Sequence, residues 1–243
     1  MTYNFKDKTV LVTGSSRGIG RGIAERLAGD GANVVINYLH NEAAAQDVVA
    51  AITAKGGTAI AIQADVARPT EIIRLFNQAE AAFGAVDIVV ANAGTAVIKS
   101  MGDFTEEDYD KVFATNTKGV FFTMQQAVNR LRDEGRIIVI TTGGVKMLIP
   151  GNALYLGSKG SLEQFIRTTA QEVGKRNITV NAVLPGYTHT DLLPERDRKV
   201  AAGASPFKRV GEPEDIAAVV AFLASSEAQW ITGQEIGAGG GVF

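Results

Sequence analysis

A tyrosine and a lysine four residues apart, Tyr155 and Lys159, are the residues of this sequence best suited to acid–base chemistry. They open a stretch in which apolar residues recur with helical spacing, and residues four apart on a helix lie on the same face. A free tyrosine has a pKa of about 10, too high for efficient proton transfer near neutrality, and a nearby cation lowers it. A solvated helix face often carries the same pair, so its interpretation depends on the rest of the chain.

A glycine-rich turn lies near the start of the chain. Residues 9–12 are a β-branched, apolar run typical of a buried strand, residues 13–20 read Thr-Gly-Ser-Ser-Arg-Gly-Ile-Gly, and helical spacing follows. Glycines let the backbone approach a pyrophosphate, and a helix N-terminus presents free N–H groups and a partial positive charge. A plain strand–helix connection also favours glycine, and the spacing Gly-x-x-x-Gly-x-Gly is not the common one. The strand–turn–helix order nevertheless favours a phosphate-binding site.

Predicted strands and helices alternate along the whole chain. Besides the helix that follows the turn, strands are predicted at 9–12, 33–37, 58–63, 87–91, 136–141, 178–184 and 232–236, and helices at 42–55, 69–83, 105–132, 155–175 and 213–225. The strands are continuous apolar runs, which is typical of a parallel sheet covered on both faces. We therefore expect an α/β fold, a doubly wound (Rossmann-type) parallel sheet of about seven strands with helices on both faces, in one domain spanning residues 1–243. Residues 187–212 show little periodicity and are predicted to form a mobile flap.

Polar and turn residues follow the predicted strands at their carboxyl ends, where doubly wound sheets bind ligands. Gly14, Asp65, Asn92, Thr142 and Pro185 all fall at or just after such ends. We expect them to converge on one crevice.

Composition excludes several classes of function. The net charge of −2, from 24 Lys and Arg against 26 Asp and Glu, comes without a basic block and argues against a nucleic-acid partner. The absence of cysteine excludes disulfides and thiol catalysis, and two distant histidines indicate no metal site. The first residues lack the apolar core of a signal peptide, and no apolar run approaches the ~20 residues of a membrane span. We expect a cytoplasmic protein without a membrane partner.

In this order and at these separations, the motifs of the chain resemble those of the short-chain dehydrogenase/reductase family, in its compact, single-domain form. The likeness covers nearly the whole chain. It rests on Thr13–Gly20, Asp65-Val66, Asn92-Ala93-Gly94, Asn116-Thr117-Lys118-Gly119, Tyr155 with Lys159, and Pro185-Gly186 followed by Thr190-Asp191.

The resemblance implies roles for the catalytic residues. Tyr155 would give a proton to the substrate carbonyl oxygen during reduction, or accept it during oxidation, as hydride moves from or to a nicotinamide. Lys159 would lower the pKa of Tyr155 and hold the nicotinamide ribose. Asn116 would support a water that links Lys159 to solvent.

Thr142 departs from the family pattern, which usually has a serine thirteen residues before the tyrosine to polarise the substrate oxygen. A threonine hydroxyl can donate the same hydrogen bond, although its methyl group restricts χ1 and takes up space. We expect Thr142 to replace the serine. The alternatives are a residue that merely ends a strand, or a slow enzyme with an altered pocket.

The resemblance also implies a dinucleotide site. The glycines of the turn would approach the pyrophosphate, Asp65 and Val66 the adenine, and Thr188 and Thr190 the nicotinamide carboxamide and phosphate. The residues expected to bind the cofactor are Gly14, Ser16, Arg17, Gly18, Ile19, Gly20, Asn37, Tyr38, His40, Asn41, Asp65, Val66, Asn92, Ala93, Gly94, Tyr155, Lys159, Pro185, Gly186, Thr188 and Thr190.

The end of the second strand bears on cofactor choice. NAD enzymes place a carboxylate there for the ribose 2′-hydroxyl, whereas residues 37–41 read Asn-Tyr-Leu-His-Asn. A 2′-phosphate would not be repelled, and Arg17 could pair with it, although a solvated turn arginine is the other interpretation. We predict NADP(H), with NAD(H) as the alternative.

The substrate is expected to be a small ketone or secondary alcohol in a mostly apolar pocket, which would suit a cyclic or polyketide-like carbonyl. We predict that the pocket is lined by Thr95, Val97, Lys146, Met147, Leu148, Pro150, Tyr187, Leu192 and Leu193. The alternative for the Met and Leu residues is a contact with the core or with a second subunit. Relatives that act on 3-oxoacyl carrier protein usually have two surface arginines where this chain has Asp133 and Gln171, which makes a carrier-bound 3-oxoacyl thioester the less favoured substrate. An NAD-dependent alcohol dehydrogenase and a non-catalytic dinucleotide-binding regulator remain as further readings, and the presence of Tyr155, Lys159 and Asn116 argues against the regulator.

Assembly is expected from the resemblance as well. The helical regions 105–132 and 154–175 carry more apolar faces than one sheet surface needs, and in this family such helices pair across a two-fold axis, which implies a homotetramer or homodimer. Trp230 is interpreted as a packing residue.

Overall fold

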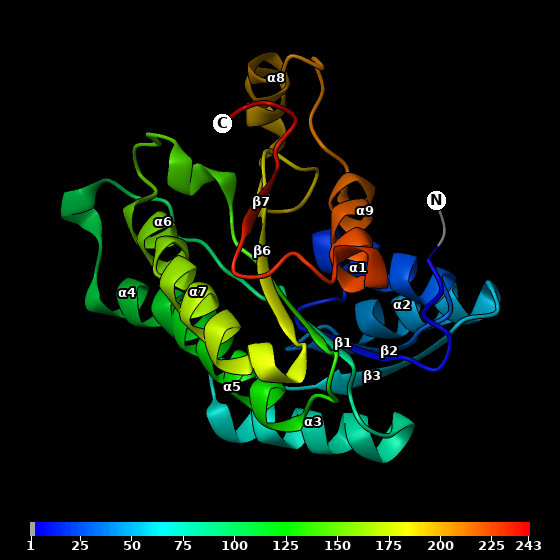
Figure 1. The fold of residues 1–243 in the computed structure, drawn as a ribbon. Coiled ribbons are helices and arrows are strands. Elements are labelled where there is room, and N and C mark those ends of the chain that lie inside the picture. Colours follow the sequence, from blue (N-terminus) through cyan, green and yellow to red (C-terminus); the bar gives the residue numbers. More distant parts are fainter. Residues whose placement is uncertain (1–2) are drawn as a thin grey trace.

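A computed structural model describes residues 3–243 (Figure 1). Met1 and Thr2, which belong to the segment tested for a signal peptide, lie outside the described residues. Within them the strands form one parallel, seven-stranded sheet in the order β3-β2-β1-β4-β5-β6-β7. The strands are β1 (Thr9–Val12), β2 (Asn33–Tyr38), β3 (Thr58–Gln63), β4 (Ile88–Ala91), β5 (Arg136–Ile140), β6 (Thr179–Pro185) and β7 (Glu235–Ala238). The order reverses between β1 and β4, so a crevice opens beyond their carboxyl ends. The predicted doubly wound sheet is confirmed.

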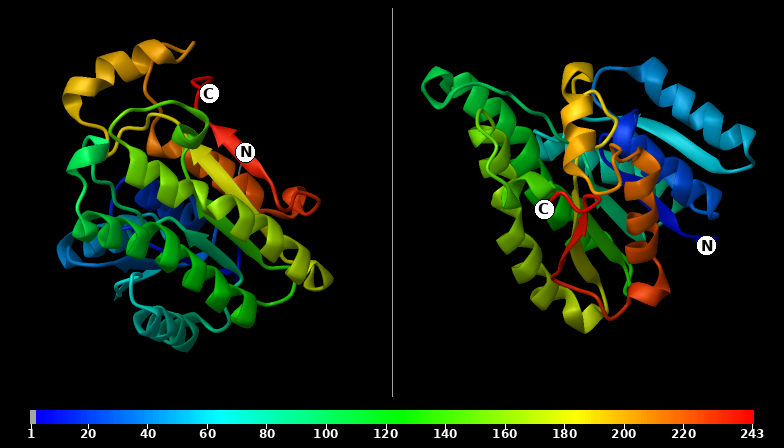
Figure 2. Two further views of the ribbon diagram at one scale, coloured as in Figure 1. Left: turned by 90° about the vertical axis from the view of Figure 1, so that its left-hand side faces the viewer. Right: turned by 90° about the horizontal axis from the view of Figure 1, so that it is seen from above.

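Helices cover both faces of the sheet (Figures 1 and 2). They are α1 (Gly18–Gly29), α2 (Glu42–Ala54), α3 (Pro69–Phe83), α4 (Glu106–Phe113), α5 (Val120–Arg130), α6 (Ala153–Gly160), α7 (Leu162–Val173), α8 (Glu195–Ala204) and α9 (Pro213–Ala224). Helices α1, α2 and α9 bury their apolar sides in one core, and α3, α5 and α7 in the other. The apolar runs of the strands follow from this, because a strand between two cores is buried on both faces.

Two long helices of the sequence prediction are interrupted in the structure. The region predicted as one helix over 105–132 divides into α4, a π-helical segment Ala114–Gly119, and α5. The region predicted over 155–175 begins earlier, at Ala153, and is interrupted at Ser161 between α6 and α7. Periodicity alone does not reveal such breaks, because apolar spacing continues through them.

The segment predicted as a mobile flap, residues 187–212, contains helix α8. Its first turn carries Glu195 and Asp197, which favour a helix N-terminus, and its only buried residue is Ala201. The sequence prediction did not include this helix, because a helix with so little buried surface leaves no apolar pattern in the sequence, and the mobility of the segment stays a prediction.

The last strand begins three residues later than predicted, at Glu235 instead of residue 232. The preceding residues approach β6 through side chains: Thr232 Oγ1 accepts from the Val180 amide at 3.1 Å, and Asn181 Oδ1 accepts from the Gln234 amide at 3.1 Å. Trp230, interpreted as a packing residue, is 96% exposed in the protomer, so that interpretation is wrong for the single chain.

Across residues 3–243, every helix is too short or too polar to cross a lipid bilayer.

Candidate active site

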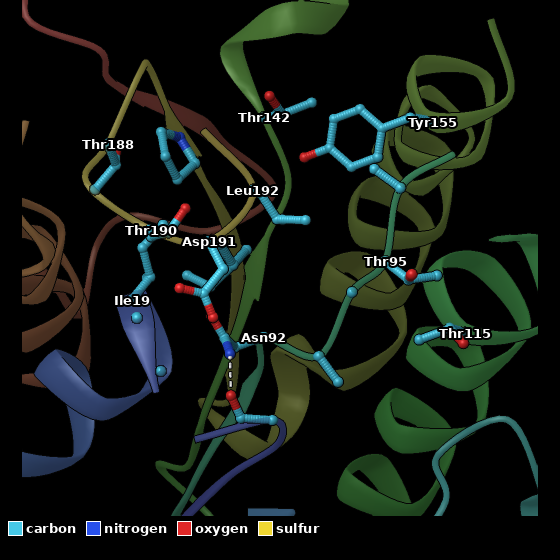
Figure 3. A pocket seen from close by; sticks show the side chains of 18 of the residues that line it. Ile19, Asn92, Thr95, Thr115, Thr142, Tyr155, Thr188, Thr190, Asp191 and Leu192 are labelled. Carbon is cyan, nitrogen blue, oxygen red and sulfur yellow. Dashed lines mark hydrogen bonds between the residues drawn. The ribbon is translucent and has the colours of Figure 1, made fainter. Parts of the chain in front are cut away.

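A cleft of about 1140 Å³ lies beyond the carboxyl ends of the strands (Figure 3). It exceeds the roughly 300–1,000 Å³ of sites for one drug-sized ligand, so it has room for a dinucleotide and a second molecule. Every residue expected to bind the cofactor lines this cleft, from Gly14 in the first turn to Thr190 beyond β6. Of the four expected catalytic residues, Thr142, Tyr155 and Lys159 line it and Asn116 lies behind its wall.

Thr142 and Tyr155 face each other across one side of the cleft. Thr142 follows β5, Tyr155 lies in the first turn of α6, and Figure 3 shows the tyrosine hydroxyl pointing toward the threonine side chain. The Thr142 hydroxyl also accepts a hydrogen bond from the Gly144 amide at 3.2 Å, which holds its rotamer. Its proton therefore remains available to an acceptor in the cleft.

Tyr155 is kept in its protonated form by its surroundings. Burial raises the pKa of its phenol above the ordinary value, and the hydrogen bond with Thr142 opposes part of that effect. Burial and Thr142 account for this shift, and the expectation that Lys159 lowers the pKa of Tyr155 stays a prediction. Near neutrality the phenol therefore carries the proton that reduction requires, although the raised pKa by itself makes it a weaker acid.

Lys159 is buried, with 4% of its surface exposed. Its Nζ donates to the Ile140 carbonyl at 2.8 Å, and desolvation lowers its pKa from 10.5 to about 8. A Cβ on Gly94 would lie 3.4 Å from this nitrogen, so Gly94 leaves the ammonium open toward the cleft. An ammonium has three donors, and those not directed at Ile140 can bind hydroxyl groups of a ligand.

Asn116 is fully buried in the π-helical segment, and its amide is occupied by protein partners. Its Nδ2 donates to the Thr95 carbonyl at 2.8 Å and to Ser158 Oγ at 2.9 Å, and its Oδ1 accepts from the Thr95 amide at 2.8 Å. π-Helical segments often occur at functional sites. Here the side chain fastens the loop after β4 to the residue that precedes Lys159, and the expected support of a water by Asn116 stays a prediction.

The glycine-rich turn is held by two asparagine amides. Asn92 Nδ2 donates to the Thr13 and Gly14 carbonyls at 2.9 and 3.0 Å, and Asn37 Oδ1 accepts from the Gly14 amide at 3.0 Å. Gly14 has φ +61°, and a Cβ there would lie 2.8 Å from Ala93 Cα. Only glycine satisfies both constraints. Asn37 and Asn92 therefore shape the turn with side chains that were expected to contact the cofactor directly.

Arg17, expected to pair with a 2′-phosphate, lies at the cleft but forms an ion pair with Asp191. Its Nη1 is 2.7 Å from Asp191 Oδ2, and both side chains are more than 70% exposed. Exposed pairs contribute at most about 1 kcal/mol. Arg17 can therefore leave Asp191 for another anionic partner at little cost in free energy. Nearby, His40 is exposed, while Asn41 Oδ1 caps α2 by accepting from the Ala44 amide at 3.0 Å.

The substrate half of the cleft is apolar, but its lining differs from the prediction. Thr95, Met147, Tyr187, Leu192 and Leu193 line it as predicted. Four predicted residues do not contribute: Val97, Lys146, Leu148 and Pro150. Lys146 pairs with Glu235 at 2.8 Å, and Leu148 is fully exposed.

Several lining residues were missed by sequence reasoning. They are apolar and come from the loop after β4, from the loop before α6, from α6, from α8 and from the end of the chain: Ile98, Ile149, Leu156, Val200, Ala201 and Val242. No sequence signal identifies Val200 or Val242, because only the folded chain brings α8 and the last residues to this cleft. In residues 3–243, no group of three or more acidic or histidine side chains could hold a metal ion.

A seven-stranded parallel sheet in this order, with a glycine-rich turn at its switch point, defines a Rossmann-type fold. A family model described as "Enoyl-(Acyl carrier protein) reductase" matches residues 14–243. The chain belongs to the short-chain dehydrogenase/reductase family, an oxidoreductase family, as its resemblance in sequence implied.

The similar proteins include short-chain dehydrogenases and reductases. Short chain dehydrogenase/reductase AacuN of Aspergillus aculeatus is 43% identical, with 98% of this chain and 97% of that protein covered. Versicolorin reductase stcU of Emericella nidulans is also 43% identical, with 99% and 97% covered. The crystal structure of angucycline C-6 ketoreductase LanV with bound NADP matches with a TM-score of 0.94 at 39% identity, covering 100% of this chain and 98% of that one.

Proposed function

We propose that this protein is an NADPH-dependent ketoreductase that reduces a ring ketone to a secondary alcohol, with Tyr155 as the general acid. The observation that carries this proposal is the position of the Tyr155 and Thr142 hydroxyls. Both lie on the side of the cleft opposite Thr188 and Thr190, next to an apolar wall (Figure 3). A carbonyl oxygen between the two hydroxyls would receive a hydrogen bond from one and a proton from the other.

The glycine turn fits a dinucleotide. Side chains are absent where a pyrophosphate would approach the α1 N-terminus: Gly14 and Gly18 have positive φ, and a Cβ on Gly20 would lie 2.5 Å from Asn92 Nδ2. The nicotinamide cofactor would supply hydride to the carbonyl carbon. Lys159 would hold its ribose through the ammonium donors that Ile140 leaves free.

The residues at the end of β2 favour NADPH over NADH as the cofactor. Asn37 is buried, with its amide bonded to the protein, and no carboxylate lies between it and Glu42. Arg17 lines the same cleft and carries an exposed guanidinium. A 2′-phosphate could replace Asp191 as its partner, because bidentate bonds between arginine and phosphate are strong. The NADP-bound LanV structure supports this choice.

In the reductive direction, the O–H bond of Tyr155 breaks as the substrate oxygen gains the proton. Thr142 polarises that oxygen with its own hydroxyl and so stabilises the negative charge that develops there. Asn116 acts as a positioning residue, because its three hydrogen bonds fasten the loop after β4 to Ser158, next to Lys159.

A fused-ring or cyclic ketone is the substrate class that the cleft favours. Its substrate half presents Met147, Ile149, Leu156 and Val242, and the names of the similar reductases refer to polycyclic compounds. A 3-oxoacyl thioester on a carrier protein is less favoured. At one position where relatives grip the carrier, Asp133 instead pairs with Arg176 at 2.8 Å.

We further propose that residues 1–243 form one catalytic domain in a homotetramer or homodimer that works in the cytoplasm. All described strands belong to one sheet. Phe121 on α5 is 41% exposed and meets Phe165 on α7 edge to face at 5.2 Å, which leaves an aromatic patch on the outer side of these helices. A second copy of the chain would cover this patch.

Oxidation of NADPH, followed at the nicotinamide absorbance, tests the proposed function against a panel of fused-ring ketones, acyclic ketones, quinones and 3-oxoacyl thioesters. We expect the fused-ring ketones to react with the highest kcat/KM and NADH to serve poorly. NADPH binding without turnover of any substrate would favour a regulator. Preference for NADH would contradict the cofactor assignment.

A further inference from the structure

Phe243, the last residue of the printed sequence, lies in a cradle of glycines between β7 and the turn that follows Thr142. A Cβ on Gly143 would lie 1.8 Å from Cε1 of its ring. A Cβ on Gly239 would lie 2.2 Å from the same ring carbon, and one on Gly237 would lie 3.3 Å from Cε2. The ring can occupy this place only because Gly143 and Gly239 carry no side chain.

On the basis of the ketoreductase activity proposed above, we propose that Phe243 is a positioning residue for substrate recognition. Its ring fastens residues 239–243 to the turn Gly143–Lys146, and this contact places Val242 in the wall of the substrate half of the cleft.

Val242 and Gly144 connect the cradle to the substrate. Val242 precedes Phe243 and lines the cleft, as does Gly144 in the turn. Gly143 itself follows Thr142, whose hydroxyl faces Tyr155 (Figure 3). The Phe243 ring therefore packs against Gly143, the residue next to the proposed catalytic hydroxyl of Thr142. It also holds its own neighbour Val242, which lines the pocket.

The same terminal segment also contacts the helix on the opposite wall. Ser205 Oγ, just beyond α8, donates to the Gly240 carbonyl at 2.7 Å, and a Cβ on Gly241 would lie 2.9 Å from Pro206 Cγ. Helix α8 contributes Val200 and Ala201 to the cleft. Figures 1 and 2 show the chain end lying beside α8. Residues 239–243 thus connect α8 to the turn after β5, and Phe243 is the apolar anchor at the turn.

A second contact, independent of the ring, also joins the turn to β7. Lys146 Nζ lies 2.8 Å from Glu235 Oε2 on β7. The ring itself is 40% exposed and does not belong to either hydrophobic core. We therefore expect Phe243→Ala to fold, and its effects to appear in substrate kinetics.

The kinetic test compares Phe243→Ala and Phe243→Leu with the parent protein, using a fused-ring ketone, a small acyclic ketone and NADPH. For the fused-ring ketone we expect kcat/KM to fall about tenfold in Phe243→Ala, since a displacement of 1 Å can cost as much as about 100-fold. Phe243→Leu should recover part of the loss, and the dissociation constant of NADPH should not change. Trp230→Ala removes an aromatic ring that is 96% exposed and serves as the matched control.

Gly143→Ala provides a reciprocal variant, because Gly143 has no positive φ and the new methyl group conflicts mainly with the Phe243 ring. We expect Gly143→Ala and Phe243→Ala to lower kcat/KM singly, and the double variant to be no worse than the poorer single one. Coupled residues show such non-additivity. Additive losses, or Phe243→Ala kinetics equal to those of the parent with every ketone, would overturn the proposal.

Nuclear magnetic resonance separates failure of this inference from failure of the proposed function. The ring current of Phe243 should shift the Gly143 Hα signals, and the shift should disappear in Phe243→Leu but persist in Trp230→Ala. Signals that do not move overturn the cradle. A parent protein that reduces no ketone contradicts the proposed function instead, and the Gly143 signals then still report whether the ring holds the turn.

Discussion

Thr142 is the residue at which this chain departs from the usual serine of its family. Its hydroxyl is held by the Gly144 amide and meets the phenol of Tyr155. The methyl group of threonine limits χ1, so this rotamer is fixed at little entropic cost.

Substitutions at Thr142 separate the hydroxyl from the shape of the side chain. We expect Thr142→Val, which keeps the shape, to lower kcat about 10²–10³-fold, the loss typical of removing an oxyanion donor. Thr142→Ser should retain turnover within a small factor. Single-turnover reduction of a ketone by NADPH measures both variants, and full activity in Thr142→Val would contradict the role.

Lys159 carries a cost in stability that follows from its burial. Its pKa is lowered from 10.5 to about 8, so the folded state disfavours the charged form. The difference of about 2.5 units corresponds to about 3 kcal/mol at pH values below 8. This penalty fades as pH rises from about 8 to 10.5, because the unfolded state then also loses its proton.

Lys159→Met should therefore have a higher free energy of unfolding than the parent protein at pH 7, and it should lose turnover. We expect a gain of roughly 1–3 kcal/mol, reduced by the Ile140 carbonyl that loses its donor. The gain should shrink above pH 8. Urea unfolding at pH 7 and pH 9.5 measures it, and a constant difference between the two pH values would show that burial of the charge is not its cause.

Arg17 should decide cofactor preference. Arg17→Ala is expected to raise the KM for NADPH about 10- to 100-fold, the value of a hydrogen bond to a charged group, and to leave the KM for NADH unchanged. Asp191→Asn is the matched control, since it frees Arg17 from its ion pair without removing it. Equal losses with both cofactors in Arg17→Ala would contradict a contact with the 2′-phosphate.

At the scale of elements, the β1–α1 turn is shaped by close backbone packing. A Cβ on Gly20 would lie 2.6 Å from the Gly14 carbonyl oxygen and 2.8 Å from Ser15 Cα. The first turn of α1 and the end of β1 can approach this closely only through glycine.

Gly20→Ala should lower the free energy of unfolding by about 1–3 kcal/mol, the usual cost of overpacking, and weaken NADPH binding. Gly29→Ala in the same helix has no atom within 4 Å of the new methyl group, and should be neutral or stabilising by up to about 1 kcal/mol. Thermal unfolding and fluorescence titration of NADPH measure the pair. Equal behaviour of the two variants would show that close packing is not the reason for Gly20.

For the whole molecule, the aromatic patch of Phe121 and Phe165 is the surface proposed to contact a second copy of the chain. Phe121→Glu would place a charge in a surface that a second copy is proposed to cover, and should shift the protein to a lower molecular mass in light scattering. Trp230→Ala, which leaves both rings of the patch in place, is not expected to do so. An unchanged mass in Phe121→Glu would place the interface elsewhere.

The arrangement of the cleft could be predicted to a large extent from local patterns. Strand, glycine turn and helix lie within residues 9–29, and parallel strands must end on the same edge. For this reason Gly14, Asn92 and Tyr155 could be expected to meet although 141 residues separate the first from the last. The roles of individual side chains were harder to predict: whether the Asn116 amide faces a ligand or the Thr95 backbone depends on packing that no local pattern encodes.

The sheet, the order of its motifs and the residues at its edge could be predicted from the chain alone, because these depend on periodicity, glycine placement and the handedness of parallel crossovers. Three contacts emerge only in the folded protein: Lys159 is buried against Ile140, Arg17 pairs with Asp191, and Phe243 packs on Gly143. The physical reason is distance along the chain. Each of these contacts joins segments whose separation leaves no periodic trace, and burial and ion pairing are set by the neighbours that folding brings together.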